Sequence, residues 1–222
     1  MPGARERLGY GAQPGEVGPA VGAQIKAGLL TDSGCQVSAS GASSGTMLCM
    51  NVEEPPSSRA THAGLVVERA EETDWERVKA VRLAALAESP SAFGSTLAEE
   101  REYGEADWRE WCRDTAAFLA VQDGVPIGIA AGVNGTSRDE RKLIAMWLHP
   151  GHRGAGASTA LLAAVRTWAL RDGATTLMLW VTRSNHAAAR LYRRAGFSET
   201  GACKPLPSNP ALIADQLALD VR

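Results

Sequence analysis

The chain has 222 residues, enough for one large domain or for one ordinary domain with an extension. Its formal net charge is −2, so charge gives no reason to expect a nucleic acid or an anionic membrane as a partner. No segment approaches the ~20 apolar residues of a membrane span, and none has the pattern of a secretion signal, so we expect a cytoplasmic protein. The four cysteines are scattered without a C-x-x-C pair, which predicts reduced thiols and no metal site.

Two parts of the chain differ in composition. Residues 1–61 are dominated by Gly, Ala, Ser and Pro and contain one aromatic residue, Tyr10. Such a segment cannot bury enough apolar surface to offset the entropy lost on ordering, so we predict a disordered N-terminal extension. Residues 62–222 contain all six Trp and all three Phe, and we predict that they form one folded domain.

The predicted domain begins with a strand and a helix. Residues 64–68 form a short apolar run typical of a strand. Thr73 and Glu76 have the spacing of a capping box, which predicts a helix that continues until Ser89 and Pro90 end it. After a loop, a second short helix places three residues on one face, where packing is a better explanation than chemistry: Trp108, Trp111 and Cys112.

A hairpin is predicted next. The segments 116–121 and 126–133 have strand composition, and Asp123 and Gly124 between them suit a tight turn. We therefore expect these two strands to pair antiparallel.

The rest of the pattern alternates strands and helices. Residues 142–148 read as a strand in the interior of the sheet, followed by a glycine-rich turn and a helix over 158–171. A further strand is predicted at 175–181, and a helix at 185–195, before the last strands.

The glycine-rich turn at 153–158 is the first chemical signal. Gly154 and Gly156 allow successive backbone N–H groups to turn toward one point, where the following helix adds the positive end of its dipole. Such a point binds an anion, most naturally a phosphate, and Arg153 would add a charge beside it. The alternative is that the glycines only permit a tight turn. The pattern is neither a Walker loop nor a dinucleotide fingerprint.

The second signal is the segment 185–197, which reads N-H-A-A-A-R-L-Y-R-R-A-G-F. With both signals in hand, the chain resembles the GNAT superfamily of N-acetyltransferases. Residues 153–158 are similar to its Q/R-x-x-G-x-G/A loop, and 185–197 are similar to its N-x-x-A-x-x-L-Y-x-x-x-G-F helix, in the same order and at the usual separation.

The resemblance implies an α/β fold with a mixed, mostly antiparallel central sheet flanked by helices. Two parallel strands, at 142–148 and 175–181, would splay apart to form the cleft for acetyl-CoA. The backbone of Met146 and Leu148 would pair with the pantetheine arm, and Asn185 would fix the helix or the pantetheine. The pyrophosphate would be held by Arg153 and the amides of Gly154, Ala155, Gly156, Ala157 and Ser158. Ser158 departs from the family's Gly/Ala, and its hydroxyl could donate to a phosphate.

The resemblance also implies that Tyr192 is the general acid that protonates the departing thiolate. The alternative is that Tyr192 only packs at the end of its helix. Asp139 and Glu140 could drain a proton through water, although solvated loop charges are the simpler interpretation. A covalent route through Cys203 lacks an adjacent base.

The acceptor side is generally shaped in this family by the first two helices, their loop and the final strands. Phe93, Ser95 and Tyr103 are the candidate substrate-binding residues. A small primary amine is favoured over a peptide or protein amine, because no strongly acidic docking surface is visible in the sequence. A homodimer is left open, and the alternative function is a non-catalytic acetyl-CoA-binding sensor or partner-docking module.

The final segment, residues 209–221, has features of both a helix and a strand. Asn209 and Pro210 suit the start of a helix, whereas the resemblance requires a terminal strand. We expect the strand, with four apolar residues on one face: Ile213, Leu217, Leu219 and Val221.

Overall fold

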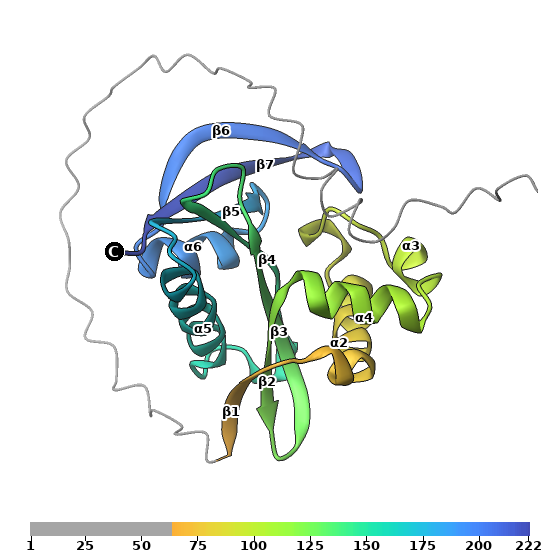
Figure 1. Cartoon of the computed structure of the whole chain (residues 1–222). Coiled ribbons are helices and arrows are strands. Elements are labelled where there is room, and N and C mark those ends of the chain that lie inside the picture. Colours follow the sequence, from red (N-terminus) through yellow and green to blue (C-terminus); the bar gives the residue numbers. More distant parts are fainter. Residues whose placement is uncertain (1–63) are drawn as a thin grey trace, which may run out of the picture.

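A computed structural model describes residues 64–222, so the disorder predicted for residues 1–61 lies outside the described part of the chain. The described residues form a seven-stranded sheet with helices on both faces (Figure 1). The strands are β1 Leu65–Arg69, β2 Ala116–Gln122, β3 Val125–Asn134, β4 Glu140–Leu148, β5 Thr176–Thr182, β6 Ser198–Leu206 and β7 Asn209–Asp220. The helices are α2 Trp75–Glu88, α3 Leu97–Arg101, α4 Glu105–Asp114, α5 Ala157–Arg171 and α6 His186–Arg194.

The strand order is β1-β2-β3-β4-β5-β7-β6, and every neighbouring pair is antiparallel except β4 and β5. The predicted mixed, mostly antiparallel sheet with one parallel pair is therefore confirmed. The hairpin turn is also confirmed, since Asp123 and Gly124 both have positive φ, at 51° and 79°. Such a turn matches the twist of the strands it joins.

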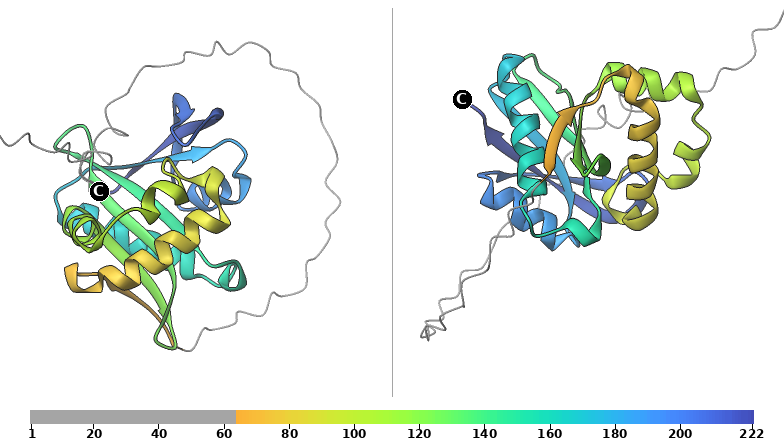
Figure 2. Two further views of the ribbon diagram at one scale, coloured as in Figure 1. Left: turned by 90° about the vertical axis from the view of Figure 1, so that its right-hand side faces the viewer. Right: turned by 90° about the horizontal axis from the view of Figure 1, so that it is seen from below.

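The helices form two separate layers. In the view from below, α5 and α6 lie on one side of the sheet and α2 and α4 on the other (Figure 2). Each layer closes its own core against the sheet: Leu161 and Val165 of α5 are fully buried on one side, and Val78 and Trp108 on the other. Burial of this kind contributes about 25 cal/mol per Å² of apolar surface and fixes the helices to the sheet.

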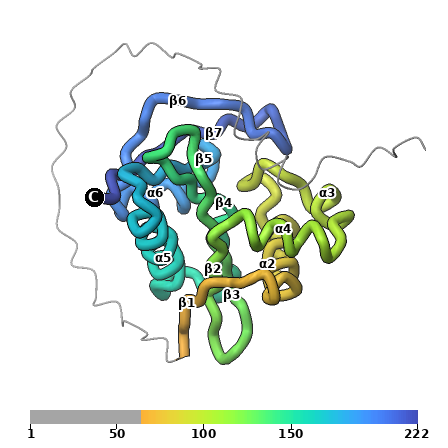
Figure 3. The backbone as a smooth tube through the Cα atoms, viewed as in Figure 1, coloured from red at the N-terminus to blue at the C-terminus, as the bar shows by residue number. Residues whose placement is uncertain are grey.

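The chain ends in a long hairpin. Figure 3 follows β6 and β7 to a tip that approaches the loop after α2. At this point the Ser208 hydroxyl donates to the carbonyl oxygen of Phe93 over 2.5 Å. The expected terminal strand is confirmed as β7, because Leu217 and Val221 face the core and pairing with both β5 and β6 outweighs the local helix signal.

Three local predictions were wrong. The capping box joins Glu71 and Asp74, where the Glu71 amide donates to Asp74 Oδ2 over 3.0 Å, and Thr73 lies inside a 3-10 turn that precedes α2. The loop before the tryptophan helix contains the short helix α3, which has its own capping box from Thr96. The apolar spacing along α5 predicts a buried stripe that includes Trp168, but this side chain is only half buried.

Candidate active site

The parallel strands β4 and β5 pair only at their first residues. The register runs from Glu140 opposite Thr176 to Lys142 opposite Met178. Both strands continue beyond that point, β4 to Leu148 and β5 to Thr182, without further mutual pairing among the described residues. The strands therefore splay, and the backbone groups on this edge of β4 are left for another partner.

A bulge lies in β4 where it passes this opening. Ile144 is opposite Ala131 and Trp147 is opposite Ile129, so Ala145 and Met146 together face one residue of β3. Ala145 has a φ of 55°, which is unusual for a residue with a side chain. A bulge of this kind re-aims the backbone groups beside it, and the groups re-aimed here include those of Met146.

The predicted phosphate loop leads from β4 into α5. Gly154 and Gly156 have φ values of 87° and 93°, and a Cβ added to either glycine would meet no atom within 4 Å. The backbone N–H groups of residues 154–159 donate to no acceptor within residues 64–222. Gly156 is the N-cap of α5. The loop therefore combines open space with unpaired donors at a helix N-terminus, which fits a phosphate group.

Arg153 does not extend over this loop. Its Nε donates to the carbonyl oxygen of Leu148 over 3.0 Å, and its Nη2 donates to Glu88 Oε2 over 2.8 Å. The expected charge beside the phosphate is thus shared with a carboxylate from α2. A sequence pattern could not reveal this, because Glu88 and Arg153 are 65 positions apart.

Glu88 is a residue that the sequence reasoning missed. Its Oε2 also accepts from Trp147 Nε1 over 2.9 Å and from the Ser89 hydroxyl. The hydrogen bond from Ser89 is the main cause that holds the pKa of Glu88 below its usual range, and the bonds from Trp147 and Arg153 act in the same direction. Glu88 therefore stays ionised and ties the end of α2 to the end of β4.

Tyr192 lies in the last turn of α6 and is 6% exposed. It belongs to the core that also contains Leu148 of β4 and Val181 of β5, the two strands that splay. Its ring centroid is 5.8 Å from that of Phe197. Burial raises the pKa of the phenol above its usual value of 10.0, so the group is protonated throughout the neutral range.

Asn185 begins α6, as expected. Its side-chain oxygen accepts from the Ala188 amide over 3.1 Å, so the structure gives it the role of a helix cap.

Asp139 and Glu140 lie at the opposite end of β4 from Met146 and Leu148. Glu140 accepts from Thr136, whose hydrogen bond is the main cause of its lowered pKa. Asp139 therefore lies in the loop that precedes β4, and Glu140 is the first residue of that strand.

The candidate acceptor residues lie beside α2, on the face of the sheet opposite α5 and α6. Phe93 is buried with the Arg82 guanidinium 4.6 Å from its ring centroid, and the Ser95 hydroxyl bonds Glu100 and Arg82 over 2.5 and 2.8 Å. Tyr103 is half buried and packs on Trp108 at 5.8 Å between ring centroids. Phe93 and Ser95 are thus held by a buried charge cluster.

That cluster is the pair Arg82–Glu100. Arg82 Nη2 donates to Glu100 Oε1 over 2.7 Å and Nε donates to Oε2 over 3.0 Å, and the two side chains are only 8% and 6% exposed. Replacing Glu100 with Gln would leave the Arg82 charge buried without a counterion. We expect the free energy of unfolding to fall by about 3–5 kcal/mol, measured by urea denaturation.

Glu102→Gln is the matched control, because Glu102 is exposed at the end of the same helix. It should change the free energy of unfolding by less than about 0.5 kcal/mol. Equal stability of the Glu100→Gln variant and the native chain would show that the pair does not hold the loop after α2.

Comparison with known proteins gives a consistent result. Residues 83–197 match the model of the acetyltransferase (GNAT) family. An uncharacterised N-acetyltransferase of Mycobacterium tuberculosis is 32% identical over 135 residues, which cover 58% of this chain and 86% of that protein. The chain therefore belongs to the GNAT family, and the protein is an acetyl-CoA-dependent N-acetyltransferase.

Solved structures share the fold. The yncA protein of Salmonella typhimurium, determined with its cofactor acetyl-CoA, has a TM-score of 0.60 at 19% identity and covers 72% of this chain and 95% of its own. A GNAT acetyltransferase of Streptococcus pneumoniae has a TM-score of 0.59 at 18% identity, with 71% and 99% covered. The expected fold is confirmed by these neighbours.

Residues 64–222 lack two kinds of feature. No helix in this part is long and apolar enough to cross a membrane. No group of three or more His, Cys, Asp and Glu side chains there is arranged to hold a metal ion.

Proposed function

We propose that the protein transfers the acetyl group of acetyl-CoA directly onto a small primary amine, with Tyr192 as the general acid. The observation that carries this proposal is the position of Tyr192 in the same core as Leu148 and Val181, on the two strands that splay. We also propose that residues 62–222 are sufficient for the reaction.

The residues that would hold acetyl-CoA lie on one stretch of chain. The unpaired amides from Gly154 to Ser158 would bind its pyrophosphate. The edge of β4 at Met146 and at the Leu148 amide would pair with its pantetheine arm, while the Leu148 carbonyl oxygen accepts from Arg153. The bulge at Ala145 would aim the Met146 amide toward the carbonyl oxygen on which charge develops. Acetyl-CoA supplies the acetyl group as a thioester.

Tyr192 would hold the proton that the departing thiolate needs. Its raised pKa keeps the phenol protonated while a neutral amine attacks. As the bond between carbon and sulfur breaks, the phenol would give its proton to the thiolate, and the proton lost by the attacking amine would return through solvent to the phenolate. Cys203 is buried on β6, and direct transfer does not require it.

The acceptor side supports a small amine. The loop after α2 and the tip of the β6–β7 hairpin are joined by the Ser208–Phe93 hydrogen bond, and a Cβ at Gly94 would lie 3.6 Å from Pro207. Two elements in contact at this place leave less room for an extended peptide than for a compact molecule.

A matched acceptor screen tests the proposal. The chain would be incubated with acetyl-CoA and primary amines, or with peptides carrying a free N-terminus or a lysine, and release of free thiol would be followed. We expect small amines to be acetylated with kcat/KM at least about tenfold above peptides, which corresponds to about 1.4 kcal/mol.

Two further outcomes are informative. Faster acetylation of the peptides would overturn the acceptor class, and saturable acetyl-CoA binding without any acetylation would favour the sensor alternative. The chain without residues 1–61 should give the same kcat/KM, and a large loss would show that the catalytic domain extends beyond residues 62–222.

A further inference from the structure

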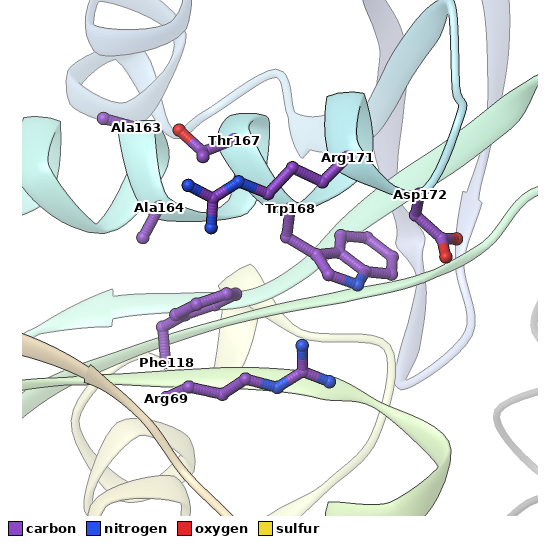
Figure 4. Close-up of a pocket in the computed structure, with 8 residues that line it drawn as sticks. All are labelled: Arg69, Phe118, Ala163, Ala164, Thr167, Trp168, Arg171 and Asp172. Atoms are coloured by element: carbon purple, nitrogen blue, oxygen red, sulfur yellow. The ribbon is translucent and has the colours of Figure 1, made fainter.

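A groove lies at the far end of α5 from the phosphate loop. It has a volume of about 650 Å³ and runs between the C-terminal half of α5 and the strands β1 and β2 (Figure 4). Gly156 caps the first turn of α5, and the residues of this helix that line the groove run from Ala163 to Arg171, so they begin ~10 Å and end ~22 Å from the phosphate loop. The groove is therefore distinct from the acetyl-CoA site proposed above.

Aromatic rings form the inner surface of the groove. Phe118 comes from β2, and Trp168 comes from α5. A Cβ added to Gly132 would lie 2.1 Å from Trp168 Cζ3, so the indole packs directly against the backbone of β3. The small side chain of Ala164 beside them leaves the groove open. The inner surface thus suits a flat apolar group.

Two arginines give the groove a positive charge. Arg69 approaches from β1 and Arg171 from α5, and both are exposed (Figure 4). Among the described residues neither guanidinium has a hydrogen-bond or ion-pair partner. Arg69 lies opposite Phe118 in the β1–β2 register, so the charge and the ring occupy the same face of the sheet.

The carboxylate in the groove and the negative end of the α5 dipole are both already paired with an arginine. Asp172 lines the groove, but Arg141 Nε donates to its Oδ2 over 2.6 Å. Arg141 Nη2 also donates to the Asp172 carbonyl oxygen over 2.9 Å, which offsets the negative end of the α5 dipole. The charges of Arg69 and Arg171 are therefore left for a ligand.

We propose that this groove binds a small aromatic acid, a flat ring that carries one or two carboxylate groups. A guanidinium pairs with a carboxylate through two parallel hydrogen bonds, and the rings of Phe118 and Trp168 take the apolar face. The volume lies within the range of small-molecule sites. An inorganic anion would use the arginines but gain nothing from the aromatic rings.

The test is a calorimetric titration of the full chain, saturated with acetyl-CoA, with phthalate. We expect saturable binding with a Kd of about 1 mM or below. Arg69→Gln and Arg171→Gln should each raise the Kd at least about tenfold. Arg166→Gln is the matched control, because Arg166 is exposed on α5 and does not line the groove, and it should leave the Kd unchanged.

Three results would overturn the proposal. The first is equal phthalate affinity in the native chain and the Arg171→Gln variant, and the second is the absence of saturable binding. The third is an equal Kd for inorganic phosphate and for phthalate in the same titration, which would show an anion site without an aromatic ligand. Since both arginines are exposed, the variants should keep the native unfolding midpoint and acetyl-CoA affinity.

Discussion

Replacement of Tyr192 with Phe should lower kcat by about 10²–10⁴-fold, the range for loss of a positioned general acid. The Kd for acetyl-CoA should stay within about twofold, because the Phe ring keeps the packing against Phe197 while the hydroxyl is removed. Single-turnover acetylation and a calorimetric titration would measure the two quantities separately.

The pH dependence of the activity follows from the direction in which burial shifts the pKa of Tyr192. Burial raises the pKa of Tyr192 above 10.0, so the proton is present at every pH below that value. The native enzyme should therefore gain activity as pH rises and the acceptor amine loses its proton, without a decline below about pH 10 caused by Tyr192. A Tyr192→Phe variant that reacts as fast as the native chain would reduce Tyr192 to a packing residue.

Replacement of Gly156 with Ala should weaken acetyl-CoA binding by about 10–100-fold. The backbone there has a φ of 93°, and the space above it is empty of protein atoms, so a methyl group would project toward the place proposed for the pyrophosphate. The left-handed conformation alone should cost about 1–2 kcal/mol of stability. Affinity would be measured by calorimetry and stability by thermal unfolding.

Gly173→Ala is the matched control at the other end of α5. Gly173 has a φ of 79° and equally empty surroundings, so it should lose similar stability while the Kd for acetyl-CoA is unchanged. Equal loss of affinity in both variants would attribute the effect to stability rather than to the phosphate loop.

Short-range sequence patterns were sufficient to predict the turns and helix caps that depend only on neighbouring residues. The Asp123–Gly124 turn was predictable because few residues accept positive φ at both positions, and the α6 cap was predictable because Asn185 can bond the first free amides. The capping box before α2 was assigned to the wrong residues. Glu71, Glu72, Thr73 and Asp74 all have side chains that can accept a hydrogen bond, and local chemistry does not choose among them.

The candidate active site also combines features that the sequence predicts with features that only the tertiary structure shows. The sequence alone determined the glycine loop, the Tyr192 helix and the GNAT family, because backbone freedom and residue spacing are local properties. Only the tertiary structure decided that Arg153 bonds Glu88, that Arg82 and Glu100 hold the loop with Ser95, and that Arg69 faces α5. These arrangements depend on which surfaces the sheet and helices bring together, and a charged side chain can pair with any partner that packing places within reach.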